Sequence, residues 1–414
     1  MSKLQPIRGT HDLLPDAMRR HSHVVDTAAT VAGRYGYDAM ATPVFEATEV
    51  FARTLGETSD VVTKEMYSFE TKGGDSVTLR PENTAGVARA IISNGLHQSV
   101  PLRYFYAGPM FRHERPQKGR QRQFHQIGIE LIGVAHPLGD VETIAAGAAV
   151  LDALEVRDRT ILELNTLGDT ESRAAYRDRL VGYLSRFKDD LSEDSRRRLD
   201  INPLRILDSK NARDREIVAG APVFGDSLTD GARAWFDAVR AGLDAIGIAY
   251  TLNERLVRGL DYYCHSAFEF TTEALGAQGA VIAGGRYDGL IGRMGGPDAP
   301  GVGWAGGIER LALLAEADLP APRPVALVPI GEAAETAALP LAERLRAAGY
   351  RIDMAFDGNL KKRMKRADRI GARAAVLIGT DELAEGAATV RDLDSGEQGR
   401  APLETLAEAL APFR

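Results

Sequence analysis

Hydrophobic and polar residues alternate along Gln123 to Ile132, which indicates a β-strand with one face against a core. One face carries Phe124, Gln126, Gly128 and Glu130, and the other carries His125, Ile127, Ile129 and Leu131. An aromatic-rich run, Arg103 to Glu114, precedes this strand, and a basic loop with proline and glycine separates the two runs. We therefore predict an antiparallel hairpin with a positive tip at Arg115 to Gln121. Its polar face presents Arg112, Glu114, Gln126 and Glu130, either as the floor of a substrate site or as an exposed amphipathic surface.

Helical spacing of apolar residues predicts a helix over residues 16–34, which Gly36 ends. The run Tyr37 to Phe45 reads as a strand, and Pro43 places it at an edge or an interface, because proline cannot donate to a central ladder. Further on, Thr78 to Gly86 predicts a strand that leads into a helix at Ala85 to Ile92. Its polar side chains at the junction could bind a ligand ammonium group or simply cap the helix.

Residues 170–240 are charged and helix-prone, with few strand-like runs, which predicts an inserted helical domain. Strand-like composition returns at Leu256 to Tyr263. A run of small residues from Gly301 then leads into an apolar helix near Arg310. Such a strand could let a flat ligand lie on it, or could only pack against a neighbouring helix.

A proline-rich linker, Ala317 to Val325, precedes a strand–helix–strand–helix–strand pattern, which predicts a small α/β domain with an open sheet. Its second helix carries a basic cluster at Lys361 to Arg366, which could contact a phosphate backbone or be a solvated face. We accordingly divide the chain into 1–168 as the first part of a core, 169–240 as the insertion, 241–317 as the second part of the core, and 325–414 as the C-terminal domain.

Composition and charge exclude several classes of protein. The 414 residues carry a net charge of −7, so any contact with nucleic acid must come from local basic clusters. The single cysteine, Cys264, cannot form a disulfide within the chain and fits a reducing cytosol. The sequence shows no metal-binding Cys/His spacing, no apolar run of membrane-spanning length and no signal-peptide core at its start, so we expect a cytoplasmic protein. The glycine-rich segment AGGRYDGL fits neither a P-loop nor a Rossmann fingerprint.

These motifs together resemble those of the class II aminoacyl-tRNA synthetases. FRHE, the basic loop, the second strand and GIERL are similar to motifs 2 and 3 of that class, and the helix followed by Pro43 is similar to motif 1, its dimer interface. RGTHDLLP, TLRPENTAG, RPQKGRQRQFHQ, LVRGLDYY and AGGRYDGL resemble the histidyl-tRNA synthetase set, from the N-terminus into the C-terminal domain. Asn83 departs from the pattern, since glycine is common there.

The resemblance implies an α+β catalytic domain with a central antiparallel sheet, a homodimer and a C-terminal α/β anticodon-binding domain. It also implies a two-step reaction, in which histidine and ATP with Mg²⁺ give histidyl-adenylate and pyrophosphate, and histidine then passes to the 3′ end of tRNA(His).

The resemblance also implies roles for individual residues. Arg112 and Arg258 are the catalytic cations at the α-phosphate and the histidine carboxylate, and Arg112, Glu114 and Arg310 bind ATP. The histidine-binding residues are Glu82, Asn83, Thr84, Gln126, Glu130, Tyr262, Tyr263 and Tyr287. Within this set, Glu130 and Tyr263 are expected to bind the two imidazole nitrogens. Lys118, Arg120 and Arg122 are expected to contact the tRNA acceptor end, and the residues that hold Mg²⁺ stay open, with Glu114 as one candidate.

Three alternatives remain from the sequence. A synthetase-like regulatory subunit of ATP phosphoribosyltransferase would usually lack the C-terminal domain and a well-preserved LVRGLDYY segment. A synthetase for proline, threonine or glycine would not need Arg258 or the pair Glu130 and Tyr263. A tRNA-binding chaperone would have no use for the active-site arginines.

Overall fold

The computed structural model describes residues 3–56, 61–116, 119–207, 209–257, 262–276 and 279–414. The chain divides into two compact units, Met1–Leu319 and Pro320–Arg414. Among the described residues, no helix is both long and apolar enough to cross a lipid bilayer.

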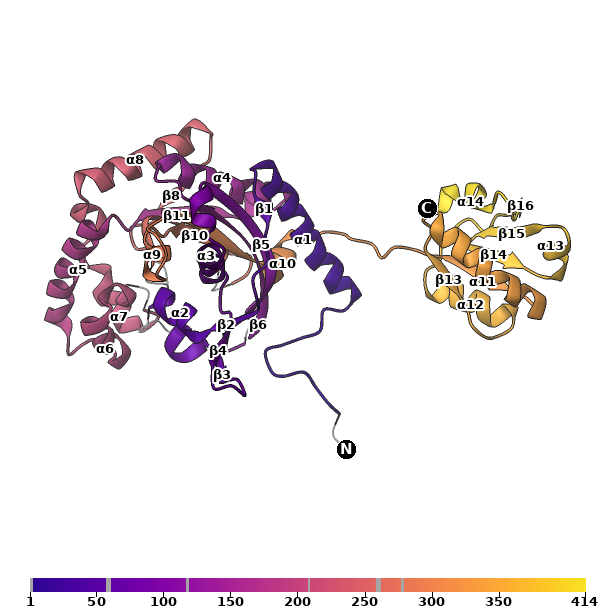
Figure 1. The fold of residues 1–414 in the computed structure, drawn as a ribbon, viewed down its shortest axis with the longest axis horizontal. Coiled ribbons are helices and arrows are strands. Elements are labelled where there is room, and N and C mark those ends of the chain that lie inside the picture. Colours follow the sequence, from indigo (N-terminus) through magenta and orange to yellow (C-terminus); the bar gives the residue numbers. More distant parts are fainter. Residues whose placement is uncertain (1–2, 57–60, 117–118, 208, 258–261, 277–278) are drawn as a thin grey trace. The chain divides into compact units, whose positions relative to one another are not determined.

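The described residues of the first unit form an eight-stranded sheet in the order β1-β5-β6-β11-β10-β9-β7-β8 (Figure 1). Its strands are β1 (Asp38–Ala39), β5 (Leu102–Phe111), β6 (Gln123–Ile132), β7 (Ile161–Thr166), β8 (Thr251–Leu252), β9 (Cys264–Thr271), β10 (Ala280–Arg286) and β11 (Gly301–Gly307). The pairs from β5 through β7 are antiparallel, as predicted, whereas β1–β5 and β7–β8 are parallel, so the sheet is mixed at its edges.

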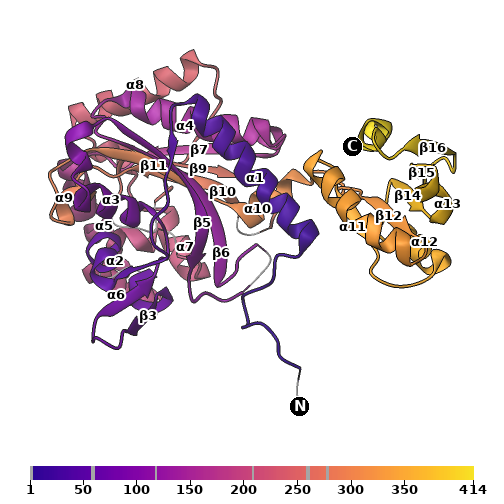
Figure 2. The same cartoon turned by 45° about the vertical axis from the view of Figure 1, so that its right-hand side comes forward.

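Helices of the first unit cover the two faces of this sheet. All the α-helices described in this unit are α1 (Pro15–Arg34), α2 (Thr48–Leu55), α3 (Thr84–Ser93), α4 (Pro137–Ala153), α5 (Thr170–Leu184), α6 (Glu193–Ile201), α7 (Ala212–Ala219), α8 (Asp230–Ala245), α9 (Leu290–Arg293) and α10 (Ile308–Ala315), of which α5, α6 and α7 pack apart from the sheet. On one face, α1, α4, α8 and α10 bury a core with Ile127, Ile129 and Leu131, the apolar set of the alternating strand (Figure 2). On the other face, α2, α3 and α9 pack with Tyr106 and Met110 around a second core.

The predicted antiparallel hairpin is formed by β5 and β6, with Tyr104 opposite Glu130 and Gly108 opposite Gln126. The strand predicted over Tyr37 to Phe45 is wrong in extent. Two short strands, β1 and β2 (Phe45–Ala47), flank an irregular segment instead, and β2 joins a separate three-stranded sheet with β3 (Tyr67–Glu70) and β4 (Ser76–Leu79). The strand predicted to reach Tyr263 is also misplaced, because β9 begins only at Cys264.

The predicted helical segment consists of α5 to α8 with short 3₁₀ turns, and α5, α6 and α7 surround a hydrophobic cluster of their own, centred on Tyr176 and Phe224. Side chains cap several of these helices, for example Asp169 on α5 and Asn211 on α7. A hydrophobic cluster of its own is typical of a segment that forms a separate domain.

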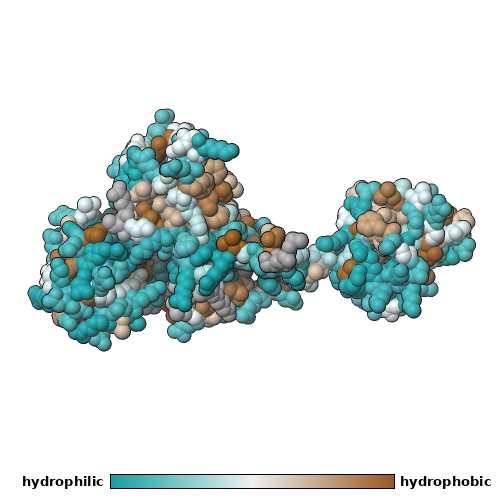
Figure 3. All heavy atoms as spheres, turned by 90° about the horizontal axis from the view of Figure 1, so that it is seen from below, coloured by the Kyte–Doolittle hydropathy of each residue, from teal (hydrophilic) through white to brown (hydrophobic). Residues whose placement is uncertain are grey.

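The described residues of the second unit form a five-stranded sheet, β13-β12-β14-β15-β16, with four α-helices. Its elements are β12 (Val325–Pro329), α11 (Glu332–Ala347), β13 (Ile352–Met354), α12 (Leu360–Arg369), β14 (Ala374–Ile378), α13 (Thr380–Ala384), β15 (Ala387–Asp392), β16 (Gln398–Pro402) and α14 (Leu406–Ala409). The predicted strand–helix–strand–helix–strand order is correct, and β12, β13 and β14 are parallel. On the face drawn in Figure 3, hydrophilic residues cover most of the surface of each unit.

Candidate active site

A cavity of about 280 Å³ opens on the face of the main sheet that carries α3. Strands β6, β9, β10 and β11, the chain before α3, and the start of α10 supply its walls. It brings together most of the predicted site residues, namely Glu82, Thr84, Arg112, Glu114, Arg120, Gln126, Tyr262, Tyr263, Tyr287 and Arg310. The polar face of the hairpin therefore contributes to the wall of a cavity.

Glu130 lies beneath this cavity and is 1% exposed. Its carboxylate accepts hydrogen bonds from Thr84 Oγ1 at 2.7 Å, from the Tyr106 hydroxyl at 3.3 Å and from the Tyr287 hydroxyl. Burial raises the pKa of Glu130 to about 8, although these hydrogen bonds act in the opposite direction. A carboxyl group in this state favours either a proton or a ligand that brings a positive charge or an N–H donor.

Glu82 is the second buried carboxylate of the site, and it also caps helix α3. It accepts hydrogen bonds from the backbone N–H groups of Thr84 at 2.7 Å and Ala85 at 2.9 Å. Burial raises the pKa of Glu82, while the two backbone hydrogen bonds and the charge of Arg112 lower it. Glu82 thus caps the helix, one of the two roles that the sequence allowed for polar side chains at this junction, and its side chain also lines the cavity.

Three tyrosines form an aromatic wall beside the two carboxylates. The ring centroids of Tyr262 and Tyr263 are 4.5 Å apart, and those of Tyr262 and Tyr287 are 5.8 Å apart in an edge-to-face arrangement. The small residues of β11 make room for this wall, because a Cβ at Gly301 would collide with the Tyr287 ring and one at Gly303 with the Glu130 carboxylate. The glycine-rich strand therefore accommodates the protein's own side chains and, at the same time, lines the cavity.

Arginine side chains surround the other part of the cavity. Arg112 Nε donates to the Pro81 carbonyl at 2.8 Å, and its guanidinium lies 5.3 Å from the centre of the Phe124 ring. Arg310 donates from Nε to the Gly119 carbonyl at 3.1 Å and from Nη1 to the Ala280 carbonyl at 2.7 Å. Burial and the charge of Arg112 both lower the pKa of Arg310, as expected when two cations share a site.

Arg120 also lines the cavity, where it forms an ion pair with Glu114. Burial lowers the pKa of Arg120; Glu65 raises it, and Arg112 and Arg310 lower it further. Arg112, Arg120 and Arg310 thus act on one another within a single cavity. Such clustered cations suit a polyanion more than a neutral ligand.

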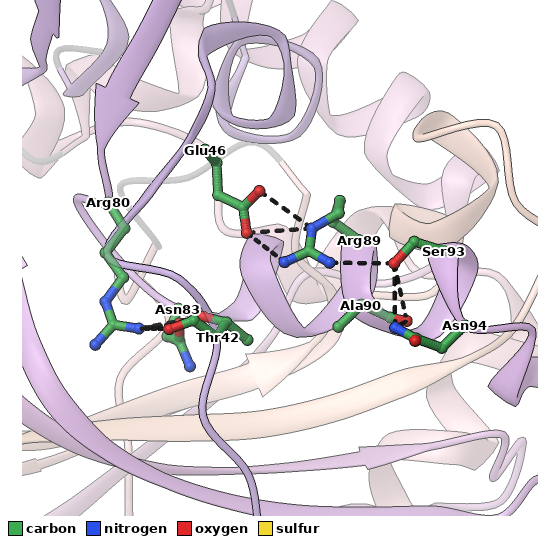
Figure 4. Close-up of polar contacts among 8 residues, drawn as sticks. All are labelled: Thr42, Glu46, Arg80, Asn83, Arg89, Ala90, Ser93 and Asn94. Atoms are coloured by element: carbon green, nitrogen blue, oxygen red, sulfur yellow. Dashed lines mark hydrogen bonds and ion pairs between the residues drawn. The ribbon is translucent and has the colours of Figure 1, made fainter.

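Besides Glu130, which lies beneath the cavity, two described residues of the predicted site do not line it, Asn83 and Arg122. Asn83 Oδ1 accepts hydrogen bonds from Thr42 Oγ1 at 2.6 Å and from Arg80 Nη1 at 3.1 Å, so it braces the junction before α3 (Figure 4). Arg122 donates from Nε to the Glu114 carbonyl at 3.3 Å. Two further predicted residues, Arg258 and Lys118, lie outside the described residues.

Sequence reasoning missed Tyr106 and Glu269. Tyr106 donates to Glu130, and its position could have been found by counting back from Arg112 in steps of two along the strand. Glu269 lines the cavity from β9, where a single carboxylate stands in the otherwise apolar run AFEF. A charge on a central strand was the signal that should have marked it.

Comparisons with known proteins agree with this geometry. Residues 9–311 match the family model "Histidyl-tRNA synthetase", and residues 324–411 match "Anticodon binding domain". The chain is 61% identical to the histidine–tRNA ligase of Gluconacetobacter diazotrophicus over 99% of both chains, and 61% identical to that of Rhodospirillum rubrum over the full length of both. The crystal structure of apo S. aureus histidyl-tRNA synthetase superimposes with a TM-score of 0.83 at 33% identity, covering 98% of this chain and 99% of that one.

The fold and the matched domains are those of an aminoacyl-tRNA synthetase with a separate anticodon-binding domain. Within that class, the chain belongs to the histidyl-tRNA synthetase family. The predicted fold class and the predicted histidine–tRNA ligase activity are confirmed. The alternative of a regulatory subunit of ATP phosphoribosyltransferase is not favoured, because relatives of high identity over the full length are histidine–tRNA ligases.

Proposed function

We propose that this cavity is where the protein activates L-histidine with ATP and then passes it to the 3′ end of tRNA(His). One observation carries the proposal. Two buried carboxylates have raised pKa values: Glu82 lines the cavity together with Arg112 and Arg310, and Glu130 lies beneath it, hydrogen-bonded to Thr84 and Tyr287 of its wall. An amino acid that is cationic at its ammonium group and polar at its imidazole fits the first half of this site, and a triphosphate fits the second.

Histidine is proposed to lie against the tyrosine wall. Glu82, Thr84 and Gln126 would hold its ammonium group, and Glu130 and Tyr263 would each contact one imidazole nitrogen. An apolar amino acid in this site would leave these buried polar groups without partners, so discrimination of about 10⁴-fold is possible without an editing step. Asn83 would contribute only indirectly, through its hydrogen bonds to Thr42 and Arg80.

The arginines are proposed to offset charge in the first step. Attack of the histidine carboxylate on the α-phosphate brings two anions together, so nearby cations lower the barrier. Arg112 and Arg258 would act at the α-phosphate and the histidine carboxylate, and Arg310 at the outer phosphates. No side chain needs to act as a nucleophile in this scheme. Burial raises the pKa of Cys264 to about 12, which makes this thiol unreactive.

Mg²⁺ is proposed to enter with ATP. Glu114 and Glu269 are carboxylates of the cavity wall, and Mg²⁺ commonly takes one or two carboxylates together with substrate phosphates. When bound, the ion would neutralise phosphate charge, which complements the arginines. Glu114 already forms an ion pair with Arg120, so a metal ion would compete with Arg120 for this carboxylate.

The acceptor end of the tRNA is proposed to meet Lys118, Arg120 and Arg122. Phosphate contacts of this kind position the nucleic acid without reading its sequence. Arg120 is held by Glu114 at the cavity, so a contact with tRNA requires that this ion pair opens. The helix α12 is proposed to contact the anticodon arm.

We further propose a cytoplasmic homodimer whose interface includes the segment around Pro43. Val44 and Phe45 are 39% and 53% exposed, and apolar side chains of this size at a strand edge suit a protein contact. The division into domains is proposed with the same bounds as in the sequence analysis, with residues 169–240 as an insertion in the catalytic core.

Amino-acid-dependent exchange of pyrophosphate into ATP tests the proposed first step. Histidine should support exchange, and proline or threonine should not; the reverse result would overturn the assignment. Arg258→Ala should nearly abolish exchange while histidine binding stays measurable.

A double variant, Lys118→Ala with Arg120→Ala, separates the two steps. It should weaken charging of tRNA(His) and spare the exchange reaction, since these cations are assigned to the tRNA. Equal losses in both assays would contradict that assignment and would instead place Arg120 in the ATP site.

A further inference from the structure

The loop between β13 and α12 in the second unit exposes an aromatic ring without an evident structural purpose. Phe356 is 89% exposed, the highest value for a phenylalanine among the described residues. A ring of this size normally stabilises a fold through burial, and here it contributes almost none. Its exposure therefore suggests contact with a partner.

The loop that carries Phe356 is held firmly by its neighbours. Arg363, which is 3% exposed, donates from Nε to the Gly358 carbonyl at 2.7 Å and from Nη1 to the Pro329 carbonyl at 2.6 Å, and it also pairs with Glu335. Asn359 caps α12 by accepting from the Lys362 backbone N–H at 3.1 Å. The chain is thus fixed from two residues after the ring, so less ordering entropy opposes binding than for a loop without such contacts.

Exposed cations follow the ring directly. Lys361, Lys362 and Lys365 are exposed on the first turns of α12, and within the described chain no ion pair engages them. Spacings of three and four residues place Lys365 beside both of the other two on the helix surface. The remaining cations of this stretch are already used, Arg363 by Glu335 and Arg366 by Asp353.

The position in the sheet supports a ligand site as well. Strands β12, β13 and β14 are parallel, so their carboxyl ends meet at one edge, and Phe356 follows β13 by two residues. In open α/β sheets, ligands bind outside the carboxyl ends of the strands. Ile330, which directly follows β12, is 38% exposed at this edge.

We propose that Phe356 is a stacking platform for an unpaired base of the tRNA anticodon loop, and that Lys361, Lys362 and Lys365 contact the adjoining phosphates. Proteins bind single-stranded RNA through aromatic rings that stack on bases and cations that follow the backbone. The inference rests on the proposed function. It assigns a base contact to Phe356, in addition to the phosphate contacts proposed for α12. A protein partner would explain the exposed ring but not the adjacent unpaired lysines.

Aminoacylation of tRNA(His) with four variants tests the proposal on the full chain. Phe356→Ala should raise the KM for tRNA by about 10-fold, because stacking on an aromatic ring has an effect of that order per base. Pyrophosphate exchange with histidine should be unchanged. Phe356→Trp should restore the KM, and Phe356→Leu should not, because leucine is apolar but has no flat face. Leu339→Ala removes another exposed apolar side chain of this unit, 54% exposed on α11, and should behave as wild type.

Binding of an RNA hairpin with the anticodon-arm sequence of tRNA(His) identifies the base. Wild-type protein should lose affinity when one loop nucleotide is made abasic, and Phe356→Ala should be insensitive to that same change. The dependence of affinity on salt should stay the same in Phe356→Ala and weaken in Lys361→Ala, since only the lysine displaces counterions.

Three results would overturn the inference. They are a wild-type KM for tRNA in Phe356→Ala, full rescue by Phe356→Leu, and a changed sedimentation coefficient in Phe356→Ala, which would assign the ring to contact between copies. These are distinct from failure of the proposed function, in which the wild-type protein itself would not charge tRNA(His).

Discussion

The catalytic sheet buries charge in two contrasting ways. Asp140 at the start of α4 and Arg286 at the end of β10 form an ion pair in which both side chains are fully buried. Arg286 also donates to the carbonyl of Val134 at 3.0 Å and to Asp288 at 3.1 Å, and its guanidinium lies 4.8 Å from the centre of the Trp235 ring. Burial lowers the pKa of Arg286, and the charges of Asp140 and Asp288 more than offset it.

Glu82 and Glu130 are nearly as buried, but their hydrogen-bond partners among the described residues are neutral hydroxyl and amide groups. Both have raised pKa values, because burial outweighs their hydrogen bonds and, for Glu82, also the charge of Arg112, whereas opposite charges more than offset burial at Arg286. The comparison separates scaffold from site. A buried charge with a complete set of partners holds the fold together, and one with only neutral partners is ready for a ligand that supplies the missing charge.

The largest effect is expected from Asp140→Asn. The substitution keeps the shape of the side chain and leaves the Arg286 charge buried without its bidentate partner, which typically costs about 3 kcal/mol or more. Both tryptophans of the sequence, Trp235 and Trp304, lie in the first unit, so urea unfolding followed by tryptophan fluorescence reports on this unit alone. Wild-type stability in Asp140→Asn would show that the pair is not part of the scaffold.

The same replacement of a carboxyl group by an amide at Glu130 should leave stability almost unchanged and impair the use of histidine. Glu130→Gln replaces a carboxyl group that burial already favours in its neutral form, so the free energy of unfolding should change by less than about 1 kcal/mol. The kcat/KM for histidine in pyrophosphate exchange should fall by roughly 10- to 100-fold, since a hydrogen bond to a charged group contributes about 1.5–3 kcal/mol. The KM for ATP serves as the internal control and should not change. A large loss of stability with normal histidine kinetics would reverse the contrast with Asp140.

The third prediction concerns pH. Glu130 has a pKa of about 8 in the folded protein and an ordinary value of 4.5, so the folded state binds the proton more tightly than the unfolded state. The resulting stabilisation is full below about pH 4.5 and is lost as the pH rises through about 8. Wild-type protein without histidine should therefore lose stability relative to Glu130→Gln between about pH 5 and 8, as measured by the same fluorescence assay. A constant difference between the two proteins over this range would show that Glu130 is ionised throughout.

Much of this site could be predicted from alternation alone. A period of two assigned Gln126 and Glu130 to one face of β6 and Ile127 and Ile129 to the other, and the structure has this division. The same rule would have placed Tyr106 on the site face, because it lies an even number of residues before Arg112.

Other features depend on contacts between distant segments, and local patterns do not contain them. The sequence placed Glu82 at a strand-to-helix junction, but it could not show that this side chain both caps α3 and lines the cavity. It also assigned Arg120 to the loop tip, whereas the structure pairs Arg120 with Glu114, a contact that depends on how the hairpin ends fold back. The Asp140–Arg286 pair joins residues 146 positions apart, and the motif AGGRYDGL directed attention to Tyr287 instead.

The smallest effect is expected where an ion pair has good geometry but no burial. Arg323 and Asp394 in the second unit form a bidentate pair with both distances at 2.7 Å, and their side chains are 42% and 56% exposed. Water solvates both groups after the pair is broken, so Asp394→Ala should cost less than about 1 kcal/mol. Because the tryptophans do not report on this unit, calorimetry of the full chain should measure the change. A loss of unfolding free energy in Asp394→Ala as large as that in Asp140→Asn would mean that geometry, and not burial, sets the contribution of an ion pair. Burial would then no longer explain why Asp140 and Arg286 hold the fold together while Glu82 and Glu130 await a ligand.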